Sequence, residues 1–331
     1  MSGALRTDAA EVGALRERYL HFAQNEAKGV SPLYEELARA VAGSDALLGF
    51  VASLPEPRRQ PNLLFAAVRH LCGTPADARH FAELVARHAE PIRCVILARG
   101  TQTNEPGRCA TLLPALARLP EPLALLEVGA SAGLCLLPDR YGYDYGRVRL
   151  EPMCPGATPS PLFPCRANGA TPVPARIPAI AWRAGLDLHP IDVRDPDESD
   201  WLETLVWPGQ EARAERLRSA LALAREEPPR VMQGDLLADL PSLAATAPKD
   251  ATLVVFYSAV LAYVAADVRE RFAHLVAELG AVWISNEAPR VLPATAAKLD
   301  HAPPEDRFLL VVDGEPIALT GPHGQSIDWL G

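Results

Sequence analysis

The N-terminal part of the chain carries apolar residues at helical spacing. Leu15, Tyr19 and Phe22 recur every three or four positions with charged residues between them, which is typical of an amphipathic helix. Ser31-Pro32 places an N-capping hydroxyl before a proline at the first helical position. No alternation of β-branched and polar residues interrupts this pattern. It therefore predicts a helical N-terminal domain over residues 1–118.

The pattern changes after residue 118. Leu123–Val128 is a short, continuous apolar run of the kind that forms a buried parallel strand. From residue 179 onward similar runs alternate with helical stretches, which predicts a parallel sheet covered by helices on both faces. The further expected strands are Ile180–Asp187, Arg230–Gly234, Ala251–Tyr257 and Ala281–Ser285, followed by a hairpin of Phe308–Asp313 and Glu315–Leu319 about Gly314. We assign this part to one domain over residues 119–331.

Residues 151–178 form an insertion in that domain. They contain eight prolines and few periodic apolar positions, so they predict neither a regular helix nor a central strand. A loop of this length inside a compact domain is usually functional, often as a lid over a site, or else disordered. Both alternatives stay open for this insertion.

Composition and charge limit the possible partners. With 331 residues, 49% of them hydrophobic, the chain can bury a sizeable core. Its net charge of −9 argues against nucleic acid or an anionic membrane as the main partner. The first residues lack the apolar region of a signal peptide, and no apolar stretch approaches the roughly 20 residues of a membrane helix. We expect a cytoplasmic protein that acts on a small molecule, and leave its oligomeric state open.

The cysteines and histidines show no metal-binding pattern. The six cysteines form no C-x-x-C pair, and the eight histidines include no H-E-x-x-H motif. We therefore expect no metal ion, and buried thiols that stay reduced.

The most informative motif is Glu127-Val-Gly129-Ala-Ser-Ala-Gly133, at the end of the first strand. A glycine turn there lets the backbone approach a ligand, and a helix after it offers free N–H groups. In dinucleotide-binding folds this turn has the sequence G-x-G-x-x-G. Here Ser131 stands between the two glycines, which disfavours binding of a pyrophosphate. The acidic residue two positions before the first glycine resembles the methyltransferase pattern E/D-x-G-x-G-x-G, which wraps the methionine part of S-adenosylmethionine. Without a ligand, the same residues form only a tight turn between a strand and a helix.

Acidic residues follow the next two strands where such a fold binds its cofactor. Asp187 ends the second strand, where a carboxylate accepts the ribose hydroxyls, and Asp235 ends the third, near the adenine amino group. Ligands bind at the carboxyl ends of the strands in open α/β sheets, so these residues are expected at one edge. The expected cofactor-binding residues are Glu127, Gly129, Ala130, Ser131, Gly133, Asp187, Asp235 and Ser258.

Polar residues near the same edge are candidates for substrate binding and catalysis. Glu287 follows the fifth strand and Glu105 lies in a polar loop, and a carboxylate in a cleft can act as a base. An exposed turn and a helix-capping loop are the ordinary alternatives for these two segments. The candidates for substrate binding are Gln102, Asn104 and Asn286, and those for catalysis are Glu287, Glu105 and Tyr257, which ends the fourth strand.

Longer motifs extend this picture over nearly the whole chain. They are Leu126-Glu-Val-Gly-Ala-Ser-Ala-Gly-Leu134, Asp139-Arg-Tyr-Gly-Tyr-Asp-Tyr-Gly146, Gly185-Leu-Asp-Leu188, Gln102-Thr-Asn-Glu105, Val206-Trp-Pro208 and Asn286-Glu-Ala-Pro289. Together they resemble a bacterial family of unknown function. The resemblance implies a methyltransferase-like Rossmann core and supplies no substrate.

The sequence thus predicts an α/β fold: a Rossmann-like methyltransferase sheet, parallel with a terminal antiparallel hairpin, preceded by an all-helical N-terminal region. The expected function is methyl transfer from S-adenosylmethionine to a small molecule, with most of the catalysis supplied by proximity in a water-poor cleft. Two alternatives stay open. One is a non-catalytic Rossmann protein that binds a ligand or a partner, and the other is a nicotinamide oxidoreductase, which the glycine turn disfavours.

Overall fold

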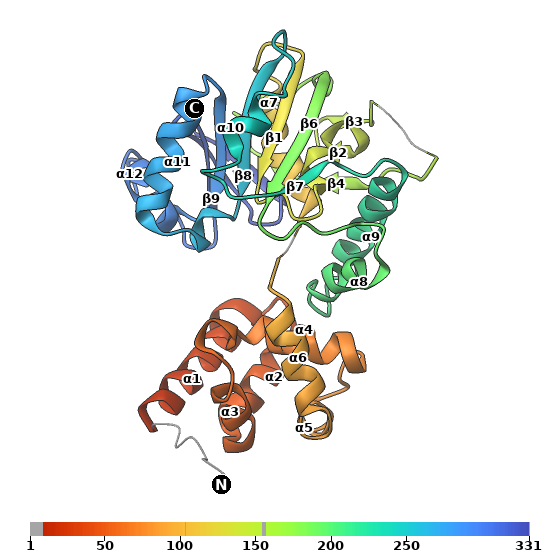
Figure 1. Ribbon diagram of the computed structural model, residues 1–331, viewed down its shortest axis with the longest axis vertical. Coiled ribbons are helices and arrows are strands. Elements are labelled where there is room, and N and C mark those ends of the chain that lie inside the picture. Colours follow the sequence, from red (N-terminus) through yellow and green to blue (C-terminus); the bar gives the residue numbers. More distant parts are fainter. Residues whose placement is uncertain (1–8, 103, 154–156, 331) are drawn as a thin grey trace. The chain divides into compact units, whose positions relative to one another are not determined.

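The computed structural model describes residues 9–102, 104–153 and 157–330 (Figure 1). The chain divides into two compact units, which we call the helical unit and the sheet unit. The described residues of the helical unit are 9–102 and 197–215, and those of the sheet unit are 104–153, 157–196 and 216–330. Helix α7 (Cys109–Leu116), which we expected in the N-terminal domain, belongs to the sheet unit, where all its residues are buried.

The described part of the helical unit contains helices and no strand, which confirms the predicted helical N-terminal region. The hydroxyl of Ser31 caps its helix as expected, because it accepts the N–H of Tyr34 at 3.4 Å. The helices are α1 (Ala9–His21), α2 (Pro32–Gly43), α3 (Asp45–Ala52), α4 (Pro61–Cys72), α5 (Ala78–Arg87), α6 (Ala89–Ala98), α8 (Pro196–Thr204) and the first turn of α9 (Glu211–Glu226), with a π-helix at Phe22–Ala27 and a 3-10 turn at Glu56–Arg58.

Residues 197–215 return to the helical unit and are fixed there by an aromatic and an ionic side chain. The Trp207 ring lies 5.2 Å from the ring of Phe22 and 5.5 Å from that of Tyr34, measured between centroids. Nη1 of Arg69 donates to two backbone carbonyls of the same segment, at 2.7 Å each. The helical unit therefore includes a segment that follows it by about ninety residues in the chain.

Among the described residues of the sheet unit, the main sheet has nine strands in the order β5-β12-β11-β10-β9-β8-β1-β6-β7. The five from β9 to β7 run parallel, and β10, β11 and β12 continue the sheet as antiparallel neighbours. The strands are β1 (Leu123–Val128), β5 (Arg166–Ala167), β6 (Ile180–Asp187), β7 (Val231–Gln233), β8 (Thr252–Ser258), β9 (Val282–Glu287), β10 (Phe308–Val312), β11 (Glu315–Thr320) and β12 (Ser326–Trp329).

The predicted α/β chain with a large, mostly parallel sheet is confirmed. The hairpin expected about Gly314 is present as β10 and β11, and Gly314 has the positive φ of 81° that such a turn requires. Two features were not expected from the sequence. Strand β12 extends the hairpin, and a separate small sheet forms from β2 (Gly142–Asp144), β3 (Arg149–Leu150) and β4 (Leu162–Pro164).

In its described residues, the proline-rich insertion contributes short edge strands. β4 lies at the edge of the small sheet and β5 at the edge of the large one. This is where proline is tolerated, because an edge strand needs fewer backbone donors for its ladder. Residues 154–156 of the insertion lie outside the described residues.

The helix that we expected directly after the glycine turn does not form. Two 3-10 turns, Leu134–Leu136 and Pro138–Arg140, stand in its place. Pro138 lacks the N–H that a longer helix would need. The hydroxyls of Tyr141 and Tyr143 donate to the carbonyls of Leu134 and Pro138, at 2.8 and 2.7 Å, so these carbonyls are bound without a helix.

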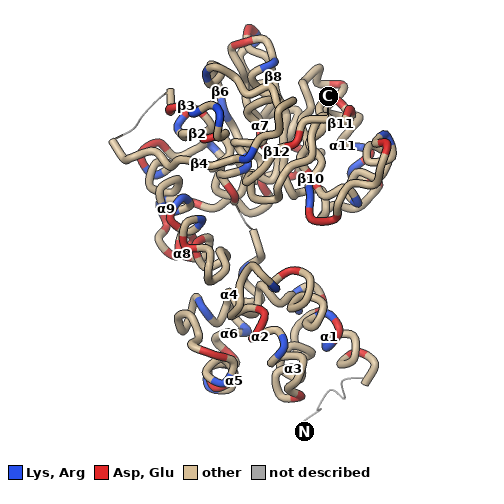
Figure 2. Tube along the Cα trace, turned by 180° about the vertical axis from the view of Figure 1, so that it is seen from behind, with Lys and Arg blue, Asp and Glu red and all other residues tan. Residues whose placement is uncertain are grey.

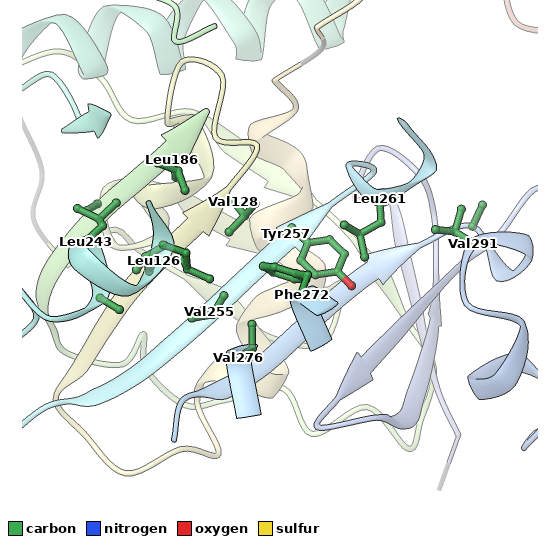
Figure 3. Close-up of a cluster of buried hydrophobic side chains, with 14 residues drawn as sticks. Leu126, Val128, Leu186, Leu243, Val255, Tyr257, Leu261, Phe272, Val276 and Val291 are labelled. Atoms are coloured by element: carbon green, nitrogen blue, oxygen red, sulfur yellow. The ribbon is translucent and has the colours of Figure 1, made fainter. Parts of the chain in front are cut away.

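One face of the large sheet packs on helices α10 (Leu240–Ala244) and α11 (Ala266–Glu278). Side chains of β1, β6 and β8 meet those of the two helices in one buried cluster (Figure 3). Phe272 of α11 is fully buried there, with its ring 5.8 Å from that of Tyr257. The alternation along β1 places Glu127 on the other face of the sheet, together with the buried Leu123 and Leu125.

Figure 2 shows acidic and basic residues interspersed along both units. None of the helices in the described part of the chain combines the length and the apolar character that crossing a bilayer requires.

Phe272→Ala tests the importance of this cluster. We expect the free energy of unfolding of the sheet unit to fall by about 3–5 kcal/mol, because the substitution leaves a cavity in a packed core. Leu330→Ala is the matched control, since Leu330 is 41% exposed, and it should change stability by less than about 0.5 kcal/mol. Denaturant titration of both variants checks this, and equal small losses would contradict the assigned core.

Candidate functional site

The carboxyl ends of four neighbouring parallel strands meet at one edge of the sheet. β1 pairs with β6 on one side and with β8 on the other, and β8 pairs with β9. The chain therefore passes from β1 first to one side of the sheet and later to the other. In open α/β sheets this reversal of strand order is where ligands bind.

The turn after β1 has an unusual backbone. Gly129, Ser131 and Gly133 have φ values of 68°, 52° and 71°. A Cβ at Gly129 would lie 2.5 Å from Cγ2 of Val260, and a Cβ at Gly133 would lie 2.7 Å from Cβ of Pro229. Both glycines are therefore required by the backbone conformation and by close protein neighbours, whereas the sequence suggested close approach to a ligand.

The carboxylate of Asp187 fixes this turn. One oxygen, Oδ2, accepts the N–H of Ser131 at 2.7 Å, and the other, Oδ1, accepts the N–H of His189 at 2.8 Å. Asp187 is only 8% exposed, so these bonds form in a largely dehydrated environment. The last residue of β6 is thereby joined to the turn that follows β1.

The side chain of Asn104 closes the turn from the other side. Its Nδ2 donates to the carbonyl of Ala130 at 3.1 Å, and its Oδ1 accepts the N–H of Leu134 at 2.8 Å. Both polar atoms of this expected substrate-binding residue are therefore bound to the backbone of the turn.

Most backbone donors of the turn already have acceptors inside the protein. A phosphate cradle needs several N–H groups that point freely at the ligand. Here, five donors are used internally: Gly129 and Ala130 donate to the Leu186 carbonyl, Ser131 to Asp187, Gly133 to the Ala130 carbonyl and Leu134 to Asn104. The turn is thus poorly suited to a pyrophosphate.

Two side-chain oxygens of the same segment lack a hydrogen-bond partner among the described residues. They are Oε2 of Glu127 and Oγ of Ser131. The two residues are 4% and 3% exposed. A buried polar atom without a partner costs about 1–3 kcal/mol. Such groups in a native fold are rare and often mark a function.

The charge state of Glu127 follows from its surroundings. Burial raises the pKa of its carboxyl well above the usual value, the neighbouring Cys135 thiol adds to the rise, and the Arg108 guanidinium opposes it. Glu127 is therefore expected to keep its proton near neutral pH.

Ser131 also completes a second motif, although we expected no nucleophile elbow in this chain and disfavoured an α/β-hydrolase for that reason. Gly129-Ala-Ser-Ala-Gly133 fits G-x-S-x-G, the strand-to-turn motif that presents a nucleophilic serine in α/β-hydrolases. A left-handed φ at a residue other than glycine costs about 1–2 kcal/mol. No base contacts Oγ of Ser131 in the described structure, however, so the geometry lacks the activating partner that a serine nucleophile requires.

The polar residues at the ends of β8 and β9 bind one another. Nδ2 of Asn286 donates to Oγ of Ser258 at 3.1 Å, and Oδ1 of Asn286 accepts the Thr320 hydroxyl at 2.7 Å. Oε1 of Glu287 accepts the N–H groups of Val260 and Leu261, at 2.6 and 2.7 Å. These bonds hold the loop after β8 against the glycine turn, where Val260 meets Gly129.

Burial raises the pKa of Glu287, although the two N–H groups that it accepts lower it in part. A carboxyl with a raised pKa suits proton transfer near neutral pH. Glu287 is 1% exposed, so a reacting group would have to displace part of this loop to reach it.

Glu105 and Arg108 lie in the same unit as the turn. Oε1 of Glu105 accepts the N–H of Gly107 at 3.2 Å, and its Oε2 lies 3.7 Å from Nδ1 of His323. The Arg108 guanidinium donates to the carbonyls of Ser258 and Pro322, at 3.0 and 2.9 Å. Arg108 was absent from the expected site residues. It is buried, and its positive charge lowers the pKa of both Glu127 and Glu287.

Three expected site residues are not joined to this group by the hydrogen bonds described above. Tyr257 points into the apolar cluster beside Phe272 (Figure 3). Asp235 is exposed, and its Oδ1 accepts the N–H groups of two residues of its own turn, at 2.8 and 3.0 Å. Gln102 belongs to the helical unit.

Metal ligation has no support in the described residues, where no three His, Cys, Asp or Glu side chains gather in a way that could hold an ion. Cys109 and Cys135 are buried free thiols. Burial and the neighbouring Cys109 thiol raise the pKa of Cys135 well above its usual value, which makes it a poor nucleophile.

The chain belongs to a family described as "uncharacterized protein conserved in bacteria (DUF2332)", whose model matches residues 16–329. The expected membership in a bacterial family of unknown function is thus confirmed. No curated protein and no solved structure matches the chain.

Asn104→Ala tests the closure of the turn. The substitution removes the partners of a carbonyl and an N–H that lie in buried residues, at a cost of about 1–3 kcal/mol each. We expect a lower melting temperature and faster hydrogen exchange of the Leu134 amide. Asn25→Ala, at an exposed position, is the control and should change neither quantity. A Leu134 amide that stays as protected as in the wild type would contradict the proposed contact.

Glu127→Gln tests the proton on Glu127. The unfolded chain ionises this carboxyl at its ordinary pKa, below the raised pKa of the folded protein, so the wild type loses stability as the pH rises between the two. The variant lacks this loss. We expect the melting temperature of the variant, relative to that of the wild type, to increase as the pH rises from about 4 to about 8.

Glu121→Gln is the control of opposite sign. The Arg176 guanidinium lowers the pKa of Glu121, so this carboxylate stabilises the fold above its unfolded pKa and loses that effect as the pH falls. The melting temperature of the Glu121→Gln variant should therefore lie furthest below that of the wild type at neutral pH. Parallel pH profiles for Glu127→Gln and the wild type would contradict the raised pKa.

Proposed function

We propose that the protein binds S-adenosylmethionine at the carboxyl edge of its parallel strands and transfers the methyl group to a small molecule. The observation that carries this proposal is the pairing of Asp187, at the end of β6, with the glycine turn after β1. The order β7-β6-β1-β8-β9 is that of a doubly wound sheet, and the antiparallel hairpin beyond β9 is what we expect of its methyltransferase variant.

The donor set of the turn favours a nucleoside without phosphates. Because most backbone N–H groups of the turn have internal acceptors, a dinucleotide would find few donors for its pyrophosphate. This disfavours the nicotinamide alternative. The two oxygens of Asp187 accept the N–H groups of Ser131 and His189, and a carboxylate at the end of this strand is an acceptor that suits the hydroxyl donors of a ribose.

The buried oxygens without partners also fit a polar ligand at this place. Oγ of Ser131 and Oε2 of Glu127 would contact the methionine part, together with the backbone of Gly129, Ala130 and Gly133. Asp187 would hold the ribose, and Asp235 the adenine. When bound, this cofactor supplies a methyl group on a sulfonium, which is activated without help from the protein.

The residues of the chain then act by holding the acceptor in line with that methyl group and by excluding water. A base is needed only for a hydroxyl or a protonated amine. Glu287 and Glu105 are the candidates, and the raised pKa of Glu287 suits this role. Asn286, Ser258 and Arg108 would line the same edge.

A second candidate is a binding protein without turnover. Specific contacts favour it, because polar atoms of three candidate site residues form hydrogen bonds that hold loops of the fold. These residues are Glu287, Asn286 and Asn104. A protein that only binds would retain the cofactor contacts and have no open catalytic group.

Calorimetric titration of the full chain with S-adenosylmethionine, S-adenosylhomocysteine and NADH separates these functions. We expect both adenosyl compounds to bind and NADH not to bind. Asp187→Asn should weaken the adenosyl compounds by about tenfold or more, because it removes a charged acceptor. Asp192→Asn is the control, because that exposed carboxylate pairs with Arg194.

Absence of binding at millimolar concentration would end the proposal, and so would a folded Asp187→Asn variant that binds as the wild type does. If the wild type binds S-adenosylmethionine but transfers no methyl group to any of a panel of small hydroxyl and amine compounds, the second candidate is favoured.

A further inference from the structure

Ser131 combines two costs that glycine would avoid at the same position. Its φ of 52° lies in the left-handed region, as do those of Gly129 and Gly133 on either side. Its hydroxyl is buried and has no hydrogen-bond partner among the described residues. A glycine would fit this backbone without strain and bring no unpaired atom. Costs of this kind, when gathered at one residue of a ligand-binding edge, indicate a function for the side chain.

We propose that the Ser131 hydroxyl is a specificity-determining group that donates a hydrogen bond to a carboxylate on the ligand, and so selects nucleosides that carry an amino-acid tail. The proposal rests on the proposed function. It adds which part of the ligand this residue recognises and which related nucleosides the site rejects.

The surroundings of the turn explain why a hydroxyl would be needed. In other anion sites, backbone N–H groups of the turn bind the negative group. Here the N–H groups of Gly129, Ala130, Ser131 and Gly133 donate to acceptors of the protein itself. The hydroxyl of Ser131 is a side-chain donor in the same turn that has no acceptor among the described residues. It is buried, so a ligand would have to displace part of its surroundings to reach it, as at Glu287.

Two acidic side chains lie near the turn. Burial raises the pKa of Glu127 well above its usual value, which favours the neutral carboxyl, and its Oε2 lacks a partner among the described residues. The Asp187 carboxylate accepts the N–H of Ser131 itself, at 2.7 Å. The Arg108 guanidinium acts on both Glu127 and Glu287 and supplies positive potential in this part of the unit. In a dehydrated site, a hydrogen bond from a neutral hydroxyl to a carboxylate is stronger than one between neutral groups.

The test compares two ligands that differ only in the tail. S-adenosylhomocysteine carries the amino-acid tail, and methylthioadenosine is the corresponding nucleoside thioether without it. We titrate the full chain and the Ser131→Gly variant with each compound by calorimetry. The variant should lose about tenfold or more in affinity for S-adenosylhomocysteine and keep its affinity for methylthioadenosine. Its melting temperature should not fall, because the backbone strain is relieved.

Ala259→Gly is the matched control. Ala259 also has a left-handed φ, of 59°, and its side chain carries no polar atom. This variant should gain stability in the same direction and leave both affinities unchanged. If Ser131→Gly fails to fold, Ser131→Ala, which keeps the native strain, replaces it with the same expected loss.

Three results would overturn the inference, and they differ from one another. Equal losses for both ligands would mean that Ser131 only shapes the turn. Unchanged affinity for S-adenosylhomocysteine, with a raised melting temperature, would mean that the hydroxyl has no ligand. If the wild type binds neither compound, the proposed function fails, and this inference fails with it.

Discussion

The contact on which the candidate site depends is the one between the Asp187 carboxylate and the N–H of Ser131, at 2.7 Å. It joins the end of β6 to the turn after β1, beside the backbone bonds from Gly129 and Ala130 to the Leu186 carbonyl. The same carboxylate accepts the N–H of His189 and so directs the chain as it leaves the sheet. Because the contact is buried, the charge is compensated by these donors rather than by water.

The rest of the site follows from how the polar groups of the turn are used. Asn104 and Leu186 take up further backbone groups, and Val260 fills the space above Gly129. The turn is therefore a rigid, nearly saturated structure rather than an open cradle. Among the described residues, Oε2 of Glu127 and Oγ of Ser131 are the side-chain oxygens of this segment that are buried without a hydrogen-bond partner. The same saturation argues against phosphates and favours a nucleoside without them.

The strands of the sheet could be predicted because continuous apolar runs are buried on both faces, and Ile180–Asp187 coincides with β6. The sequence also predicted that Asp187 ends the strand after the glycine turn. The helix expected after that turn was wrong, because Pro138 and two tyrosine hydroxyls end it locally. The role of Asn104 could not be read, since its partners lie 26 and 30 residues away and no periodicity connects them. Tyr257 ends its strand as expected, yet the alternation of side chains turns it to the apolar face.

The most direct test of this account is a crystal structure of the protein grown with S-adenosylhomocysteine. We predict the nucleoside at the carboxyl ends of β1 and β6, with its ribose hydroxyls within hydrogen-bond distance of the Asp187 carboxylate, which keeps its bonds to Ser131 and His189. A nucleoside bound elsewhere in the molecule, or a ribose that makes no contact with Asp187, would contradict it.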